Sequence, residues 1–282
     1  MSEAIVTARG LTKVFEAGKQ SVRALRGVDV EFREGEFLAL VGPSGSGKTT
    51  FLNLVGALDV PTSGDLIVLG RRIAELSKRE RAEMRLRSIG FVFQAFNLVP
   101  VLTALENVEF VLELQGVGAE RRALAMAALE ELGLGDIADR RPGELSGGQQ
   151  QRVAVARAVA ARPKLVLADE PTANLDGENA EILMHLMRDL CERHRMTFVF
   201  STHDPRVVAH ALRVVTLVDG RVARDEAKPG EAPHAIVPVV GGLRCGAARW
   251  RPASAWPSAS LPPPRGRRTP RSAGGQWSGA SP

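Results

Sequence analysis

The stretch Phe37–Thr50 reads FLALVGPSGSGKTT. Five apolar residues, short enough for a buried strand, lead into Gly42–Thr49, which matches the pattern G-x-x-x-x-G-K-[ST]. In such a loop the glycines let backbone N–H groups surround phosphate oxygens, Lys48 supplies positive charge, and the Thr49 hydroxyl can ligate Mg²⁺. A glycine-rich turn between a strand and a helix can show the same letters without a ligand. The apolar strand before the loop and the helical pattern after it favour the phosphate site.

Two further apolar runs end in residues suited to act on a bound phosphate. KLVLADE ends in Asp169 and Glu170, and TFVFSTH ends in His203. Open α/β sheets bind ligands at the carboxyl ends of their strands, so we expect these residues near the glycine-rich loop. Asp169 is suited to position Mg²⁺, Glu170 to polarise an attacking water, and His203 to contact the terminal phosphate and steady that water. Each is weak alone, because acids after strands often cap helices and single histidines are more often structural.

The chain becomes helical in its middle section. FVFQ is interpreted as a strand that ends in Gln94, whose amide can reach the metal or the water and report the nucleotide state to the following helices. Alone, such a glutamine would be a surface polar residue. A capping box at Thr103 and Glu106 and the Ala- and Leu-rich run Arg121–Leu132 predict helices up to about residue 163. We interpret this section as a helical insertion into an α/β core.

The stretch Leu145–Val159, LSGGQQQRVAVARAV, places two glycines at the start of a helical pattern. Ser146 and Gln149 fit a capping box, in which the serine caps an early N–H and the glutamine reaches back. That interpretation leaves Gly147 and Gly148 unexplained, since each glycine costs a helix about 1 kcal/mol relative to alanine. The second interpretation is that bare backbone lets an anion approach the exposed N–H groups at the helix start.

Composition excludes several classes of protein. The chain has 282 residues, of which 44% are hydrophobic and 24% charged, as is ordinary for a globular protein. No apolar run approaches a membrane span, and the N-terminus lacks the layout of a signal peptide, so we expect a cytoplasmic protein. Cys191 and His194 have a metal-like spacing, but no second pair of ligands accompanies them, so we expect no site there.

The net charge of +5 belongs to the C-terminal segment 229–282, which holds seven arginines and one acid. The remaining 228 residues are nearly neutral, so the basic composition does not indicate that the folded part binds nucleic acid. The basic segment Arg71–Arg87 is interpreted as a solvated helix face, with a nucleic-acid-binding patch as the alternative. The C-terminal segment has no periodicity, and we expect it to be mostly disordered.

The order and spacing of these motifs resemble the ATP-binding subunits of ABC transporters, over roughly Ala4–Val222. LSGGQ matches that family's signature. The resemblance implies a P-loop NTPase core with an antiparallel β subdomain and an inserted helical subdomain at about 95–163, in a nucleotide-binding domain spanning 1–228. It implies an ATPase that uses ATP and Mg²⁺. It also implies a head-to-tail homodimer, or a pair with another nucleotide-binding domain. Two ATPs would be sandwiched between the two subunits, with LSGGQ closing on the γ-phosphate held by the other subunit.

The resemblance assigns roles residue by residue. The catalytic residues would be Glu170, His203 and Lys48. The ATP-binding residues would be Phe15, Val22, Gly42, Pro43, Ser44, Gly45, Ser46, Gly47, Lys48, Thr49, Thr50 and Gln94. The signature residues, binding ATP in trans, would be Leu145, Ser146, Gly147, Gly148 and Gln149. The loop coupling the two sites would include Asn174, Leu175 and Asp176, and the Mg²⁺ site would include Thr49, Gln94 and Asp169. Phe15 stands where the family usually has tyrosine. Phenylalanine keeps the aromatic face that stacks on adenine and loses only the hydroxyl.

Four stretches resemble the macrolide-exporter and lipoprotein-release branch of the family: GPSGSGKTTFLNLVGALDVPTSG, GFVFQAFNLVPVLTALENVEF, ELSGGQQQRVAVARA and LADEPTANLD. That implies a subunit on the cytoplasmic face of the membrane that energises an integral membrane permease for export or extraction. One alternative is a soluble ABC ATPase acting in DNA repair or translation. Another is a nucleotide-gated binding module with little turnover. The single cassette, with no zinc spacing and no heptad run, disfavours the first alternative, and the complete catalytic set disfavours the second.

Overall fold

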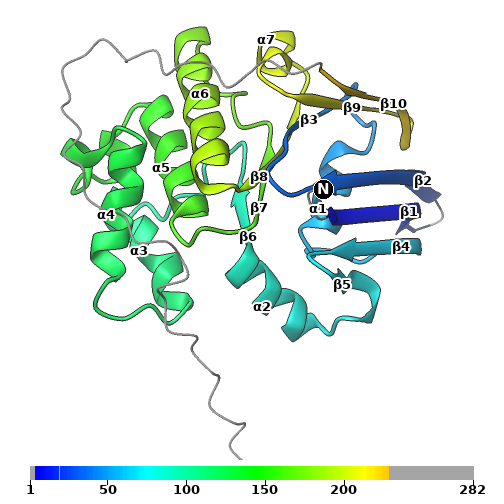
Figure 1. The fold of residues 1–282 in the computed structure, drawn as a ribbon, viewed down its shortest axis with the longest axis horizontal. Helices are drawn as coiled ribbons and strands as arrows, with labels where there is room; N and C mark the ends of the chain where they lie inside the picture. The colour runs from blue at the N-terminus through cyan, green and yellow to red at the C-terminus, as the bar shows by residue number, and fades with distance from the viewer. Residues whose placement is uncertain (1–3, 19, 229–282) are drawn as a thin grey trace, which may run out of the picture. The chain divides into compact units, whose positions relative to one another are not determined.

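The computed structural model describes residues 4–18 and 20–228, and the basic C-terminal segment lies outside them. Within these residues a six-stranded sheet has the order β10-β9-β3-β8-β7-β6 (Figure 1). Its strands are β3 (Phe37–Val41), β6 (Ile89–Val92), β7 (Leu165–Asp169), β8 (Thr197–Thr202), β9 (Arg213–Val218) and β10 (Arg221–Ala227). All neighbours pair in parallel except β9 and β10. The predicted α/β fold is therefore confirmed.

The central strands are buried on both faces, which explains why their sequences are continuously apolar. In β3, Phe37 and Ala39 belong to the core on the helical side of the sheet, whereas Leu38 and Leu40 belong to a second core on the opposite side. The helical side is covered by α3 (Ala104–Leu114), α4 (Arg121–Glu131), α5 (Gly147–Val159) and α6 (Gly177–His194).

The second core is closed by an antiparallel sheet of order β2-β1-β4-β5, together with α1 (Lys48–Val55). Its strands are β1 (Ala4–Ala17), β2 (Gln20–Arg33), β4 (Ser63–Val68) and β5 (Arg71–Arg72). In β2 the buried Val28, Val30 and Phe32 alternate with exposed charged residues, so one face packs inward and the other meets solvent. Figure 1 shows this sheet and the green helices α3 to α5 on opposite sides of the parallel sheet.

The remaining elements are short or lie at the edges of the sheets. They are α2 (Lys78–Ser88), α7 (Pro205–Ala209) and three 3₁₀ turns, Ile73–Glu75, Gly135–Ile137 and Pro142–Glu144. Capping boxes start α3 at Thr103 and α5 at Ser146, as the sequence predicts, and a third starts α2 at Ser77. None of the helices in the described ranges combines the length and the apolar character that a membrane crossing needs.

Two strand predictions have different outcomes. The sequence RVVTLVDGRV (Arg213–Val222) predicts a hairpin with its turn at Asp219 and Gly220, and the pairing of β9 with β10 confirms it. Both turn residues have positive φ (48° and 74°), the conformation that a tight hairpin turn demands. The prediction that Gln94 ends a strand is wrong, because β6 ends at Val92. Phe96 and Asn97 then adopt left-handed backbone, which is incompatible with strand pairing.

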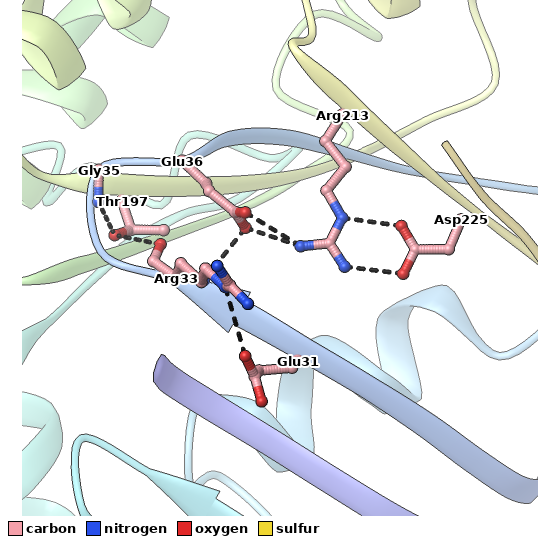
Figure 2. A network of polar contacts seen from close by, with 7 residues as sticks. All are labelled: Glu31, Arg33, Gly35, Glu36, Thr197, Arg213 and Asp225. Carbon is pink, nitrogen blue, oxygen red and sulfur yellow. Dashed lines mark hydrogen bonds and ion pairs between the residues drawn. The ribbon is translucent and has the colours of Figure 1, made fainter. Parts of the chain in front are cut away.

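A polar network ties the strands together at the edge where β3 begins (Figure 2). The guanidinium of Arg213, on β9, donates to Glu36 at 3.0 Å and to Asp225, on β10, at 2.7 Å. Its side chain is only 18% exposed. The hydrogen bonds to Asp225, with the nearby charge of Glu36, hold the pKa of the guanidinium above its ordinary value. The network therefore supports the β9–β10 hairpin with charge-assisted, mostly desolvated hydrogen bonds.

We predict that Arg213→Gln lowers the free energy of unfolding by about 2 kcal/mol, because it leaves two partly buried carboxylates without their cation. Arg33→Gln is the matched control. Arg33 pairs with Glu31 on the surface, both being about half exposed, so its loss should cost under about 0.5 kcal/mol. Urea unfolding of both variants measures the difference. Equal effects of the two substitutions would contradict the role of Arg213.

A phosphate-binding loop and the strand ends beside it

The glycine-rich loop Gly42–Thr49 connects β3 to α1, and its glycines are needed within the chain itself. A Cβ at Gly42 would lie 2.1 Å from the carbonyl oxygen of Leu217, and one at Gly47 would lie 2.6 Å from that of Ala24. Gly45 and Gly47 have positive φ of 79° and 103°. No side chain caps the N-terminus of α1, so its first N–H groups remain available to an anion.

The polar side chains of the loop fit a phosphate. The Lys48 ammonium folds back onto the loop and donates to the carbonyl oxygens of Gly42 at 2.8 Å and Pro43 at 3.2 Å. The Ser46 hydroxyl is buried and has no hydrogen-bond partner among residues 4–18 and 20–228. Thr49 is exposed on the first turn of α1. A buried, unpartnered hydroxyl beside a lysine and uncapped N–H groups is the donor set that a phosphate oxygen would satisfy.

The register of the parallel strands brings the predicted residues to this loop. Val41, just before the loop, pairs with Thr202 on β8, and Ser201 pairs with Asp169 on β7. The Ser201 hydroxyl donates to the Asp169 carboxylate and accepts from the N–H of Glu170 at 3.0 Å. Ser201 was not predicted from the sequence as a site residue. A serine inside an otherwise apolar strand was the available signal, but its partners depend on the register.

Glu170 occupies an unusual position. Its φ is 49°, in the left-handed region, and its N–H is also held by the carbonyl oxygen of Ser201 at 3.2 Å. Its carboxylate lies 3.0 Å from Nδ1 of His203, whose side chain is 71% exposed. Backbone strain of this kind persists only where surrounding contacts enforce it, and it is concentrated at functional sites. Glu170 and His203, 33 residues apart, are thus brought together beside the loop.

The segment after β6 is joined to the loop that precedes α6. The carbonyl oxygen of Gln94 accepts a hydrogen bond from Asn174 at 2.8 Å, while the Gln94 residue is exposed. Asp176 caps α6 by accepting from the N–H of Asn179 at 2.8 Å, which holds the pKa of the Asp176 carboxyl below its ordinary value. From α5, Arg157 donates to the carbonyl oxygens of the two residues that follow Ala95. These contacts connect the strand end to the inserted helices.

The glycines of the signature stretch have two different surroundings. A Cβ at Gly148 would lie 2.5 Å from the Asn179 side chain, so this glycine is required by packing against α6 within the chain. A Cβ at Gly147 would meet nothing closer than 3.8 Å, so packing within the chain does not require a glycine there. Leu145 is buried and Ser146 is exposed. In the described residues no hydrogen bond or ion pair joins the signature stretch to the phosphate-binding loop.

Phe15 and Val22 face each other across the β1–β2 hairpin. They are unusually exposed for large apolar residues, at 42% and 55%. The Lys13 ammonium lies 5.0 Å from the centre of the Phe15 ring. The same β2 strand reaches Ala24, whose carbonyl oxygen lies against Gly47 of the loop. The exposed ring of Phe15 therefore lies on β1, paired with the strand that borders the loop, where it can stack on a base.

Comparison with known proteins identifies the arrangement. Residues 25–173 match the ABC transporter family model. The chain is 45% identical to the lipoprotein-releasing system ATP-binding protein LolD 1 of Caulobacter vibrioides, over 80% of this chain and 97% of that protein. It is 44% identical to the macrolide export ATP-binding/permease protein MacB 1/2 of Paracoccus denitrificans, over 78% of this chain and 33% of that longer protein.

Solved structures give the same result. A dimeric structure of the ATP-binding cassette MJ0796, bound to ADP and Pi in a post-hydrolysis state, matches with a TM-score of 0.74 and 43% identity. The match covers 80% of this chain and all of that chain. MJ0796 is an ABC transporter ATP-binding protein of Methanocaldococcus jannaschii. The chain therefore belongs to the ABC transporter family, as the subunit that binds and hydrolyses ATP to energise a membrane transporter.

Proposed function

We propose that the chain hydrolyses ATP with Glu170 as the group that polarises the attacking water and His203 as the group that steadies it. The observation that carries this assignment is the Glu170–His203 contact of 3.0 Å at the edge that bears the phosphate-binding loop. Lys48 and the N–H groups at the start of α1 would stabilise the charge that develops on the transferred phosphoryl group. The exposed Phe15 and Val22 would hold the adenine.

Mg²⁺ fits the residues at this edge. Thr49 and Asp169 supply the hydroxyl and carboxylate oxygens that this ion prefers, and it would neutralise charge on the phosphate oxygens. Ser201 orients the Asp169 carboxylate through its hydroxyl. The unpartnered Ser46 hydroxyl lies in the same loop and fits a phosphate oxygen of the nucleotide. We assign to Gln94 the role of sensing the metal or the water, since its backbone is already tied to Asn174.

The complete site would form between two copies of the chain. The bare backbone at Gly147 and the exposed N-terminus of α5 suit the γ-phosphate of an ATP held by the partner subunit. The loop Asn174–Asp176 packs beside this stretch and would couple the two sites across the homodimer. The dimeric MJ0796 structures support this arrangement. We take 1–228 as the nucleotide-binding domain and about 95–163 as its helical subdomain.

The partner would be an integral membrane permease, bound on the cytoplasmic face of the membrane. An apolar cavity of about 510 Å³ is lined by α2, β6, α3 and α5. Leu58, Val99 and Phe110 line it and are also exposed, which is the character of a surface that a partner covers. Asn97 and Arg157 line the same cavity, and the Arg157 guanidinium donates a hydrogen bond to the carbonyl oxygen of Asn97. An occupant of the cavity would therefore contact the segment that follows Gln94. We assign the cavity to a cytoplasmic helix of the permease.

The names of the relatives indicate the chemical class of the transported cargo and not a single compound. Relatives are named for lipoprotein release and for macrolide export, so we propose export, or extraction of a lipid-linked or apolar substrate from the membrane. The cavity of the described residues is assigned to the permease, and we propose that cargo specificity resides in the permease.

We predict that Glu170→Gln lowers kcat for ATP hydrolysis by about a hundredfold or more and leaves ATP affinity within about threefold. The amide keeps the size of the side chain but cannot polarise the water. Phosphate release and nucleotide binding measure the two effects. Glu192→Gln, on the surface of α6, is the control and should retain normal turnover. Retention of most of the activity in Glu170→Gln would contradict its role.

Ser201→Ala should lower kcat by about tenfold to a hundredfold, because Asp169 and the N–H of Glu170 both lose the hydroxyl that positions them. Thr197→Val removes a hydroxyl from the opposite end of the same strand, where it bonds the backbone of Gly35 and Arg33. This control should lose similar stability and keep its kcat. Comparing kcat at temperatures where both variants are folded separates positioning from stability. Equal kcat losses would count against the positioning role.

Phe110→Glu should reduce permease binding at least tenfold while leaving the ATPase activity of the isolated protein unchanged, because it places a charge in the apolar cavity. The assay captures partners of the tagged Glu170→Gln protein, with ATP, from solubilised native membranes. Ile182→Glu, an exposed apolar position on α6, is the control. Capture of an integral membrane protein that Phe110→Glu alone abolishes supports the assignment. Capture of ribosomal or DNA-repair proteins only would support the soluble alternative, which the relatives do not favour.

A further inference from the structure

Three potential metal ligands meet where α6 packs against α7. Glu181 and His185 are one turn apart on α6, and His210 is the C-cap residue of α7. Each offers one ligand atom, and the three atoms lie within 4.8 Å of one another. His210 Nε2 lies 2.8 Å from a Glu181 carboxylate oxygen, and the rings of His185 and His210 are edge-to-face with centres 5.0 Å apart.

The donor set is that of a transition metal. Two imidazole nitrogens and one carboxylate oxygen are ligands that Zn²⁺ accepts, with water at a fourth, open position. Residues i and i+4 project from the same helix face, so Glu181 and His185 can bind one ion without distorting α6. The Glu181 side chain is 49% exposed and the His185 residue is exposed, so an ion and its water can reach the site. His210 is only 12% exposed and anchors the cluster.

We propose that Glu181, His185 and His210 bind a divalent transition metal ion of the Zn²⁺ class, separate from the Mg²⁺ of the nucleotide site. A polar contact between the two helices requires only the Glu181–His210 pair. An ion is the ligand that uses all three side chains. Small rotations of the side chains would bring the three atoms from their present separation to the distances of one coordination sphere, about 2.0–2.2 Å from the ion.

The site would clamp two helices that follow nucleotide-site residues. α6 begins immediately after Asp176, and α7 begins two residues after His203. α7 has five residues, too few to be stable alone, so its position depends on contacts with its neighbours. An ion shared between α6 and α7 would hold them together and raise the stability of the folded state by mass action.

The Cys191–His194 spacing noted in the sequence does not form such a site. Cys191 is buried with its thiol against the carbonyl oxygen of Gly35, and burial raises the pKa of that thiol to about 12. His194 contacts Glu131 instead. His194 therefore provides a matched control, since it is a histidine on α6 that contacts a glutamate outside the proposed cluster.

The test uses the full-length, untagged protein without nucleotide and with excess Mg²⁺. Zn²⁺ is titrated by calorimetry, and Co²⁺ absorption reports the coordination geometry. We expect one ion per chain, at least tenfold weaker binding in His185→Gln and in His210→Gln, and unchanged binding in His194→Gln. Zn²⁺ should raise Tm in the wild type and not in the two cluster variants.

Three results would overturn the proposal: no stoichiometric binding by the wild type, unchanged binding in either cluster variant, or an equal loss in His194→Gln. His185→Gln keeps the Glu181–His210 hydrogen bond intact, so a loss of binding in this variant cannot be attributed to disruption of that contact.

Discussion

The nucleotide site depends on the register between three parallel strands. β3, β8 and β7 end at the same edge of the sheet, and their pairing places Val41 beside Thr202 and Ser201 beside Asp169. A shift of one residue would turn every side chain of a strand to the opposite face. The register is fixed because both faces of β3 are buried, with Phe37 in one core and Leu38 in the other. Packing far from the nucleotide therefore determines where the carboxylates lie.

The two glycines of the signature stretch, Gly147 and Gly148, have different surroundings. Gly148 is explained by its contact with Asn179, so it belongs to the architecture of the single chain. Gly147 has no such neighbour, and we propose that its bare backbone admits the phosphate of an ATP held by the partner subunit. Asn179 also donates to Asp176, so the start of α5 and the loop before α6 are held as one unit.

Features that depend on neighbouring residues in the chain could be predicted from the sequence. The phosphate-binding loop, the capping boxes at Thr103 and Ser146, and the turn at Asp219 depend on residues within a few positions of each other. Glu170 and His203 were predicted as site residues because the glycine-rich loop had already indicated a phosphate site at the same edge of the sheet. The family resemblance, which the comparisons confirm, added the subunit arrangement.

What the sequence did not reveal depends on contacts between distant segments. The two hydrogen bonds of the Ser201 hydroxyl require the β7–β8 register, and one of them holds the N–H of Glu170, whose backbone is left-handed. The end of β6 before Gln94 was misplaced because the apolar run continues past the pairing. The cluster that includes His185 and His210 exists only because α6 packs on α7.

We propose that a second copy of the chain completes the nucleotide site through Gly147. The most direct measurement is the mass of the Glu170→Gln protein in solution, with and without ATP, compared with the same protein carrying Gly147→Phe. We predict that Glu170→Gln forms a dimer with ATP and that adding Gly147→Phe abolishes this dimer. Tm should be nearly unchanged by Gly147→Phe, because the space at Gly147 is open within the chain. A protein that stays monomeric with ATP, or a dimer that persists with Gly147→Phe, would contradict it.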